Sequence, residues 1–266
     1  MDCRALEIGP HGPLHDRAWM VVDADDTTQF ATQRGDPRLA LVEPSIGHDA
    51  LVTTAEGMSP LRVWRDRWDT GERLPTKVHK AICWGADQGA EAADWFSELL
   101  GRRMRLLRML DDDLRVPNRV PVDVASAGLK FADGYPILLT TDTSLNALNV
   151  ARSAEIAPFT MDLFRPNIMV TGSREPWEEE TWRRFRCGEV PMHGAKPCDR
   201  CSIITTHQQT GARTPRHLGE LLRIHYGLRD GKKVPLFGMN LIPAHHGTIR
   251  LGDPIGEITY GPRPEL

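Results

Sequence analysis

The chain has 266 residues, of which 40% are hydrophobic and 26% charged, a composition typical of a packed globular protein with one large or two medium domains. Lys and Arg number 33 against 36 Asp and Glu, so the formal charge is −3, and no basic run has the length of a nucleic-acid patch or a polybasic membrane anchor. Neither a signal peptide nor an apolar run of membrane-spanning length is recognisable, so the sequence predicts a cytoplasmic protein that binds neither nucleic acid nor a membrane.

The first part of the chain, up to about residue 80, has short apolar runs separated by Gly, Pro and Asp, which predicts strands and turns. Residues 87–101 change to the spacing of an amphipathic helix, with Asp87 as a candidate cap and Gly101 as a suitable end. Basic and apolar residues alternate over residues 103–110, a pattern typical of an edge strand.

In the second part, the apolar run 136–141 predicts a strand, and residues 142–152 predict a short helix after it. Further strands are predicted at 202–206 and 238–242, with a helix at 217–226 between them. Near the end, "LGD" at 251–253 predicts the tight turn of a closing hairpin. Many strands with few helices predict an α+β fold that is predominantly β, with a boundary between two regions near residues 80–105.

The five cysteines are an odd number in a long chain, which favours reduced thiols over a disulfide framework. Cys198 and Cys201 form a CxxC pair that has three possible interpretations. A dithiol redox pair would stand at the start of a helix, whereas "SIITT" after Cys201 favours a strand. A zinc site could use Cys187 and His193 as well, although their spacing is irregular. In the third interpretation both cysteines are small structural residues at a strand entrance.

Three arginines stand where predicted strands meet turns, namely Arg17, Arg165 and Arg200. Each of them alone is most simply a solvated residue or one member of an ion pair. If several converged on one thiolate, they would form a site for an anionic ligand, because guanidinium groups bind phosphate through paired hydrogen bonds.

Seven segments occur in one order along the chain: "GPHGPLHDRAWMVVD", "TQRGDPRLALVEP", "FADGYPILLTTDTSLNALN", "FRPNIMVTG", "PWEEETW", "KPCDRCSIITTHQQTG" and "PLFGMNLIPAHHGTIRLGD". In these segments the chain resembles proteins with a MOSC N-terminal β-barrel domain followed by a MOSC domain. This family is related to the C-terminus of molybdenum cofactor sulfurase and to the mitochondrial amidoxime-reducing component. The resemblance implies two barrel-like domains with a few helices, at residues 1–95 and 96–266.

The resemblance also implies site residues. Cys201 is expected to be the thiolate ligand of molybdenum, and Cys198 is not expected to bind the metal. Other residues are expected to hold the molybdenum-pterin cofactor: Arg17, Thr143, Ser144, Arg165, Asn167, Asp199 and Arg200. Asp199 stands where serine is common in amidoxime-reducing members, and a carboxylate there would relay protons, as a catalytic residue beside Cys201, or repel an anionic substrate.

Members of the family begin with a strand that ends in a Pro-Val-Lys-Ser-like stretch, whose Lys and Ser bind the cofactor. This sequence has Met1 and Asp2 at the corresponding point. The expectation is therefore that either the sequence starts too late or the protein lacks the first strand and two cofactor contacts.

The function that the resemblance implies is a molybdenum-cofactor oxidoreductase that reduces small N-hydroxylated substrates. Because no second cysteine cluster is present for an iron–sulfur centre, an external electron-transfer protein or reductase is expected as a partner. The alternative is a protein that carries the cofactor or sulfur without reducing a substrate, and a zinc module remains a third possibility.

Overall fold

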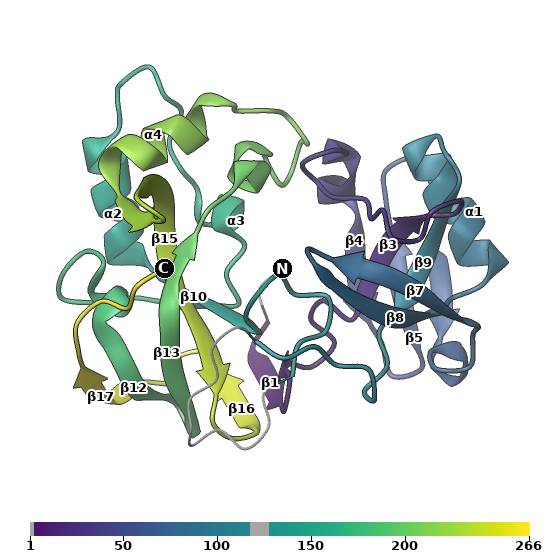
Figure 1. The fold of residues 1–266 in the computed structure, drawn as a ribbon, viewed down its shortest axis with the longest axis horizontal. Helices are drawn as coiled ribbons and strands as arrows, with labels where there is room; N and C mark the ends of the chain where they lie inside the picture. Colours follow the sequence, from purple (N-terminus) through teal and green to yellow (C-terminus); the bar gives the residue numbers. More distant parts are fainter. Residues whose placement is uncertain (1–2, 118–127) are drawn as a thin grey trace.

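The computed structural model describes residues 3–117 and 128–266. Over these residues the chain forms two lobes that lie side by side (Figure 1). The fold is α+β and predominantly β, as predicted. No helix in the described ranges is long and apolar enough to cross a membrane.

The first lobe combines two antiparallel sheets with one helix. One sheet has the strand order β3-β9-β8-β7 and the other the order β4-β5-β6. The strands are β3 (Trp19–Asp23), β4 (Glu43–Ile46), β5 (Ala50–Thr54), β6 (Leu61–Trp64), β7 (Arg73–Val78), β8 (Ala81–Asp87) and β9 (Met104–Arg108). Two 3-10 helices, η1 (Pro37–Leu41) and η2 (Arg65–Arg67), lie in the connections.

Helix α1 (Ala90–Leu100) packs on the sheets of the first lobe through side chains three and four residues apart. Trp95, Phe96 and Leu100 are buried against Leu61 and Leu106 in one apolar cluster. The helix ends at Gly101, whose φ of 68° is the left-handed conformation that glycine adopts without strain. The sequence therefore predicted this helix and its end correctly, but the residue before its start is Gly89 and not Asp87, which ends β8.

The second lobe is built on a seven-stranded sheet with the order β11-β10-β15-β13-β12-β17, in which β14 also pairs with β15. Its strands are β10 (Ile137–Thr141), β11 (Ile168–Val170), β12 (Trp182–Cys187), β13 (Val190–Asp199), β14 (Tyr226–Arg229), β15 (Lys232–Pro243) and β17 (Ile255–Tyr260). The helices are α2 (Asp142–Ala151), α3 (Met161–Phe164) and α4 (Arg216–Ile224), with the 3-10 helices η3 (Glu178–Thr181) and η4 (Ser202–Thr205).

A small third sheet ties the start of the chain to its end. In it β1 (Ala5–Gly9) pairs with β2 (Gly12–Pro13) on one side and with β16 (Gly247–Arg250) on the other. The first strand of the chain therefore packs with the second lobe, and the segment after it crosses to β3 in the first lobe (Figure 1). This crossing places residues 14–18 between the lobes.

Three sequence predictions about single elements were wrong. Residues 202–205 form the 3-10 helix η4 instead of a strand, and Ile204 is fully buried among helix residues such as Leu221. Strand β9 is not an edge strand, because it lies between β3 and β8. Strands β16 and β17 do not form a hairpin with each other, since β16 pairs with β1 and β17 pairs with β12.

The domain boundary between residues 95 and 96 stays a prediction. Helix α1 spans that boundary, and β9, which follows it, pairs with β3 and β8 of the first lobe.

Candidate functional site

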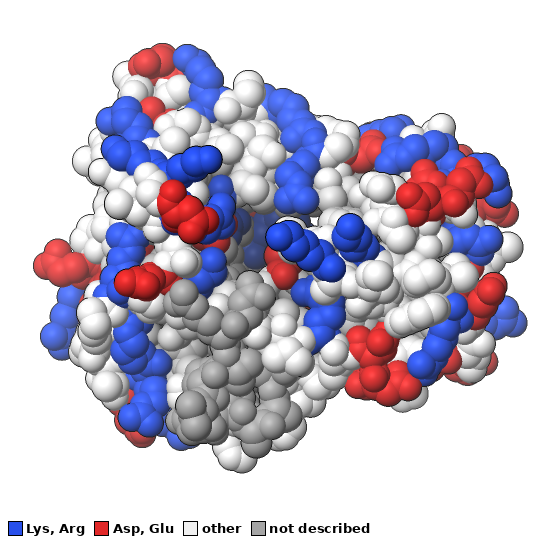
Figure 2. Space-filling view, in the orientation of Figure 1, with Lys and Arg blue, Asp and Glu red and all other residues white. Residues whose placement is uncertain are grey.

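A cavity of about 350 Å³ is lined by residues of both lobes. It contains six of the eight residues that the sequence pointed to: Arg17, Arg165, Asn167, Asp199, Arg200 and Cys201. Figure 2 shows a hollow near the centre of the molecule, with Lys and Arg side chains around it. The first lobe contributes Arg34 and His79 to the lining, and the end of the β14–β15 hairpin contributes Arg229.

Cys201 lies at the exposed side of this cavity, between the end of β13 and the start of η4. The turn is fixed by the backbone N–H of Arg200, which donates to the carbonyl of Pro235 on β15 at 2.8 Å. The sulfur of Cys201 accepts a hydrogen bond from Nη1 of Arg34 at 3.3 Å. An exposed thiol beside a guanidinium is the kind of group that acts as a nucleophile or a soft metal ligand.

Cys198 has a different environment, although it is only three residues earlier. It is half-buried, and its sulfur accepts a hydrogen bond from Nη1 of Arg200 at 3.1 Å. The same guanidinium donates to the carbonyl of Phe164 at 2.7 Å and lies over the Phe164 ring. Both cysteines are free thiols in the structure, and only Cys201 is exposed.

Arg17 and Arg165 bring two positive charges together in the cavity. Both residues have left-handed backbone conformations, with φ of 51° and 54°, which non-glycine residues adopt at some energetic cost. Burial and, to a smaller extent, the positive charge of Arg17 together lower the pKa of Arg165 to about 10. Arg17 is paired with Asp16 at 3.7 Å, whereas the guanidinium of Arg165 makes no hydrogen bond within the described residues.

Asn167 holds the two sides of the cavity together instead of pointing a free amide into it. Its side-chain oxygen accepts from the backbone N–H of Leu138 at 2.9 Å, and its amide nitrogen donates to Asp16 at 3.1 Å. Because Asp16 in turn pairs with Arg17, Asn167 fixes the position of that arginine indirectly.

Asp199 is one of three carboxylates that line the cavity. One of its oxygens accepts from Nζ of Lys196 at 3.0 Å and the other from Nη1 of Arg229 at 2.5 Å. Burial alone would raise the pKa of Asp199, but the hydrogen bonds and charges of Lys196 and Arg229 outweigh burial and leave the pKa below its usual value. Asp199 is therefore an ionised group that holds two cations at this site.

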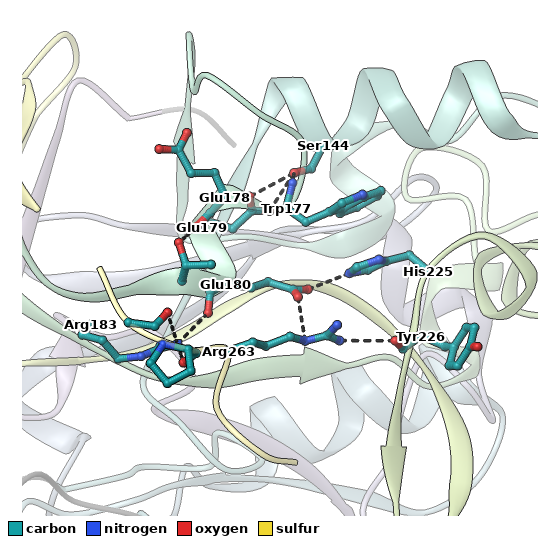
Figure 3. Close-up of polar contacts among 12 residues, drawn as sticks. Ser144, Trp177, Glu178, Glu179, Glu180, Arg183, His225, Tyr226 and Arg263 are labelled. Atoms are coloured by element: carbon teal, nitrogen blue, oxygen red, sulfur yellow. Dashed lines mark hydrogen bonds and ion pairs between the residues drawn. The ribbon is translucent and has the colours of Figure 1, made fainter. Parts of the chain in front are cut away.

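The two remaining predicted residues, Thr143 and Ser144, do not line the cavity. Thr143 donates to the carbonyl of Ser173 at 3.0 Å at the start of α2. Ser144 is fully buried and donates to both oxygens of Glu179 at 2.9 Å, in the network of Figure 3. Their role as cofactor contacts remains a prediction, and the contacts observed here are structural.

Glu179 and Glu180 are the centre of that network. Burial raises the pKa of Glu179 to about 7, although hydrogen bonds from Ser144 and Thr141 act in the opposite direction. Glu180 accepts from His225 at 2.8 Å and pairs with Arg263 at 2.9 Å, and the His225 ring stacks on Trp177 (Figure 3). The network thus joins α2, η3, the end of α4 and the C-terminal segment.

Sequence reasoning missed Arg34, Arg229 and Asp16 as residues of the site. Arg34 lies within one of the seven quoted segments, but a single arginine in a loop has no spacing that distinguishes it from a solvated residue. Arg229 stands in a hairpin whose distance from Cys201 only the fold reveals.

A larger cavity, of about 680 Å³, lies between β11, β16 and β17. Its lining includes Cys187 but neither Cys198 nor Cys201, so the four residues of the zinc interpretation do not share one cavity. Among the residues that the structure describes, no group of three or more His, Cys, Asp or Glu side chains is arranged to hold a metal ion. We therefore place the candidate site at the smaller cavity, on the chemistry of its lining.

Comparison with known proteins gives a consistent result over most of the chain. Residues 1–103 match the MOSC N-terminal beta barrel domain, and residues 127–256 match the MOSC domain. The mitochondrial amidoxime reducing component 2 of Rattus norvegicus is 30% identical over 264 residues, a match that covers 92% of this chain and 73% of that protein. Component 2 of Homo sapiens is 28% identical over 265 residues, and component 1 of Homo sapiens is 25% identical over 264 residues. Both matches cover 96% of this chain and 76% of the relative.

Proposed function

Since the chain belongs to the family of proteins with a MOSC N-terminal β-barrel domain and a MOSC domain, which includes the mitochondrial amidoxime-reducing components, we propose that it is a molybdenum-cofactor-dependent reductase of N-hydroxylated substrates. The observation that supports this most is the position of one exposed thiol, Cys201, in a cavity with Arg17, Arg165 and Arg200. A soft ligand beside several cations suits a metal held by an anionic cofactor.

The residues in the cavity fit such a cofactor. The guanidinium of Arg165 has no hydrogen-bond partner among the described residues, and the buried Nε of Arg200 has none either. Leaving the buried Nε of Arg200 without a partner is costly, and a phosphate would supply an acceptor for it and for the guanidinium of Arg165. In the proposed complex Cys201 would ligate the metal, and Arg17 and Arg165 would bind the phosphate.

The reaction can be written for an amidoxime. One amidoxime, two electrons and two protons give one amidine and one water, because the N–O bond is broken and its oxygen leaves as water. Bound molybdenum cofactor would supply the two-electron redox centre for this step. The chain's own part is to hold the cofactor in a cationic cavity, to orient the substrate beside Cys201 and to leave that side open to solvent. In this proposal the electrons come from a separate electron-transfer protein or reductase.

Purified full-length protein would test the proposal. We expect about one molybdenum with pterin per chain, and reduction of benzamidoxime with reduced methyl viologen as the electron source. C201S should lose the metal, whereas C198S should keep it, because Cys198 is directed to Arg200. A protein that holds the cofactor and reduces no N-hydroxylated compound would instead be a carrier.

The cytoplasmic location predicted from the sequence also stays a proposal, and the relatives compared above are mitochondrial by name.

A further inference from the structure

The β14–β15 hairpin contributes Arg229, beside its turn, to the lining of the cavity. Asp230 and Gly231 join the two strands with positive φ values of 51° and 73°, the conformation of a tight hairpin turn. Arg229 is the last residue before this turn, and its Nη1 donates to Asp199 at 2.5 Å. The hairpin thereby extends a guanidinium over the cavity that contains Cys201.

Asp199 uses both of its oxygens to hold cations at this place. Lys196 occupies one oxygen at 3.0 Å and Arg229 the other, and the Asp199 side chain is 27% exposed. Arg229 lines the cavity with a side chain that is 48% exposed, and its contact with Asp199 uses Nη1, which leaves Nε and Nη2 as hydrogen-bond donors for a ligand. A serine at position 199 would have no charge to bind this arginine, so the contact depends on the aspartate of this chain.

The lining of the cavity has a surplus of positive charge. It contains six Arg or Lys residues against three Asp residues, a balance of +3 when His79 is neutral. Arg17 and Arg165 lie together and face the proposed cofactor phosphate, whereas Arg34 and Arg229 approach the cavity from the first lobe and from the hairpin. A cleft with charges of one sign concentrates ligands of the other sign and aligns them.

We propose that Arg229, held in the lining of the cavity by Asp199, selects N-hydroxylated substrates that carry an anionic group such as a carboxylate. This inference rests on the proposed function and names the class of substrate for the same site. Arg229 acts as a specificity residue, because a guanidinium binds a carboxylate through charge-assisted hydrogen bonds that a neutral substrate cannot make. Asp199 acts as the residue that positions Arg229.

The test uses two substrates of nearly equal size. These are 4-carboxybenzamidoxime, which is anionic at neutral pH, and 4-carbamoylbenzamidoxime, in which a neutral amide replaces the carboxylate. The quantity compared is the ratio of their kcat/KM values for the molybdenum-loaded protein. We expect a preference for the carboxylate of roughly three- to tenfold, mainly in KM and reduced by salt. R229Q should bring the ratio close to one.

K233Q provides the matched control, because it removes one positive charge from the same hairpin. Arg229 pairs across the hairpin with Lys232, so Lys233 points to the opposite face, where it lies over the ring of Tyr226. The preference should survive K233Q if Arg229 acts by contact. Equal losses in K233Q and R229Q would overturn the proposal, because the preference would then come from net charge.

A binding measurement tests the role of Arg229 separately from the proposed reductase activity. Calorimetry on the loaded protein should show tighter binding of the carboxylate compound, lost in R229Q, whether or not turnover is observed. Selective binding without reduction of either compound would support the role of Arg229 and contradict the proposed reductase. Reduction of both compounds with the same kcat/KM in the wild type would support the reductase and overturn the role of Arg229.

Discussion

Arg34 of the first lobe donates a hydrogen bond to the sulfur of Cys201, 167 residues further along the chain, at 3.3 Å. The loop that contains Arg34 is held by the second lobe as well, because Arg213 donates to the carbonyl of Arg34 and Thr206 donates to the carbonyl of Gln33. The candidate metal ligand thus belongs to one lobe, and the cation that donates to it belongs to the other. The site is complete only when the lobes are packed together.

The first prediction concerns this contact. R34Q removes the guanidinium beside Cys201 and keeps a polar side chain, so we expect benzamidoxime reduction to fall roughly tenfold, with lower molybdenum content per chain. Thermal unfolding should change little, because Arg34 is only half-buried. R62Q, on the exposed side of β6, removes the same charge away from the cavity and should keep wild-type activity and metal. Wild-type metal content and activity in R34Q would show that the contact has no functional role.

The second prediction is that a mutation in the cavity stabilises the cofactor-free protein, whereas most mutations destabilise a protein. Arg165 is a desolvated cation whose guanidinium has no hydrogen-bond partner among the described residues, and burial together with Arg17 lowers its pKa to about 10. R165M removes this unfavourable charge and keeps a long side chain. We expect the cofactor-free protein to melt roughly 2–4 °C higher, a change that corresponds to about 1 kcal/mol in a chain of this size.

The same variant should lose the cofactor, since Arg165 is a proposed phosphate ligand. In R165M we therefore expect the pterin content, measured by fluorescence, to fall and the melting temperature, measured by calorimetry, to rise. This combination is expected for a residue that destabilises the fold but is needed for binding. A lower melting temperature together with retained pterin would mean that Arg165 is a structural residue.

The sequence predicted the elements whose signals are local. Helix α1 was predicted because Trp95, Phe96 and Leu100 repeat at helical spacing and Gly101 ends the helix. The segment after Cys201 was predicted wrongly, because β-branched residues favour strands only where a partner strand is present. Here Ile204 is instead covered by Phe159 and Leu221, which come from other parts of the chain.

Non-local pairing explains the other differences. A turn at 251–253 is visible in the sequence, but the partner of β16 is β1, about 240 residues earlier, and no local pattern contains this pairing. The same limit applies to the site. Six residues known from motifs meet in one cavity, whereas Arg34 and Arg229 reach this cavity only through the packing of the lobes and of the hairpin.

A third prediction uses the accessibility of the five thiols. Cys3 and Cys201 are exposed, whereas Cys83 and Cys187 are buried. Burial raises the pKa of Cys83, and it raises the pKa of Cys187 to about 11, with Asp253 acting in the same direction. In metal-free native protein at pH 7.5, iodoacetamide should therefore modify Cys3 and Cys201 first and leave Cys83 and Cys187 unmodified.

Peptide mass spectrometry gives the extent of modification at each cysteine, and a sample unfolded in guanidinium provides the control in which all five should react. Rapid modification of Cys187 in the native protein would contradict the packing of β12 described here. Bound cofactor should protect Cys201 and leave Cys3 reactive, so the same experiment reports occupancy of the site.

The last prediction concerns pH and Glu179, which is fully buried and has its pKa raised by burial to about 7. The folded state therefore prefers the protonated carboxyl, and the unfolded chain releases the proton near the ordinary pKa of 4.5. The stability linked to Glu179 is fully present below pH 4.5 and is lost as the pH rises to about 7, by on the order of 3 kcal/mol. E179Q, which resembles the protonated acid, should remove this loss, so that chemical denaturation shows the variant more stable than wild type at pH 8 and similar to it at pH 5.

E56Q, in an exposed turn, is the matched control and should follow the wild-type pH dependence. If E179Q followed it too, the carboxyl of Glu179 would be ionised in the folded protein, and its contacts with Ser144 and Thr141 would have to be strong enough to compensate for burial.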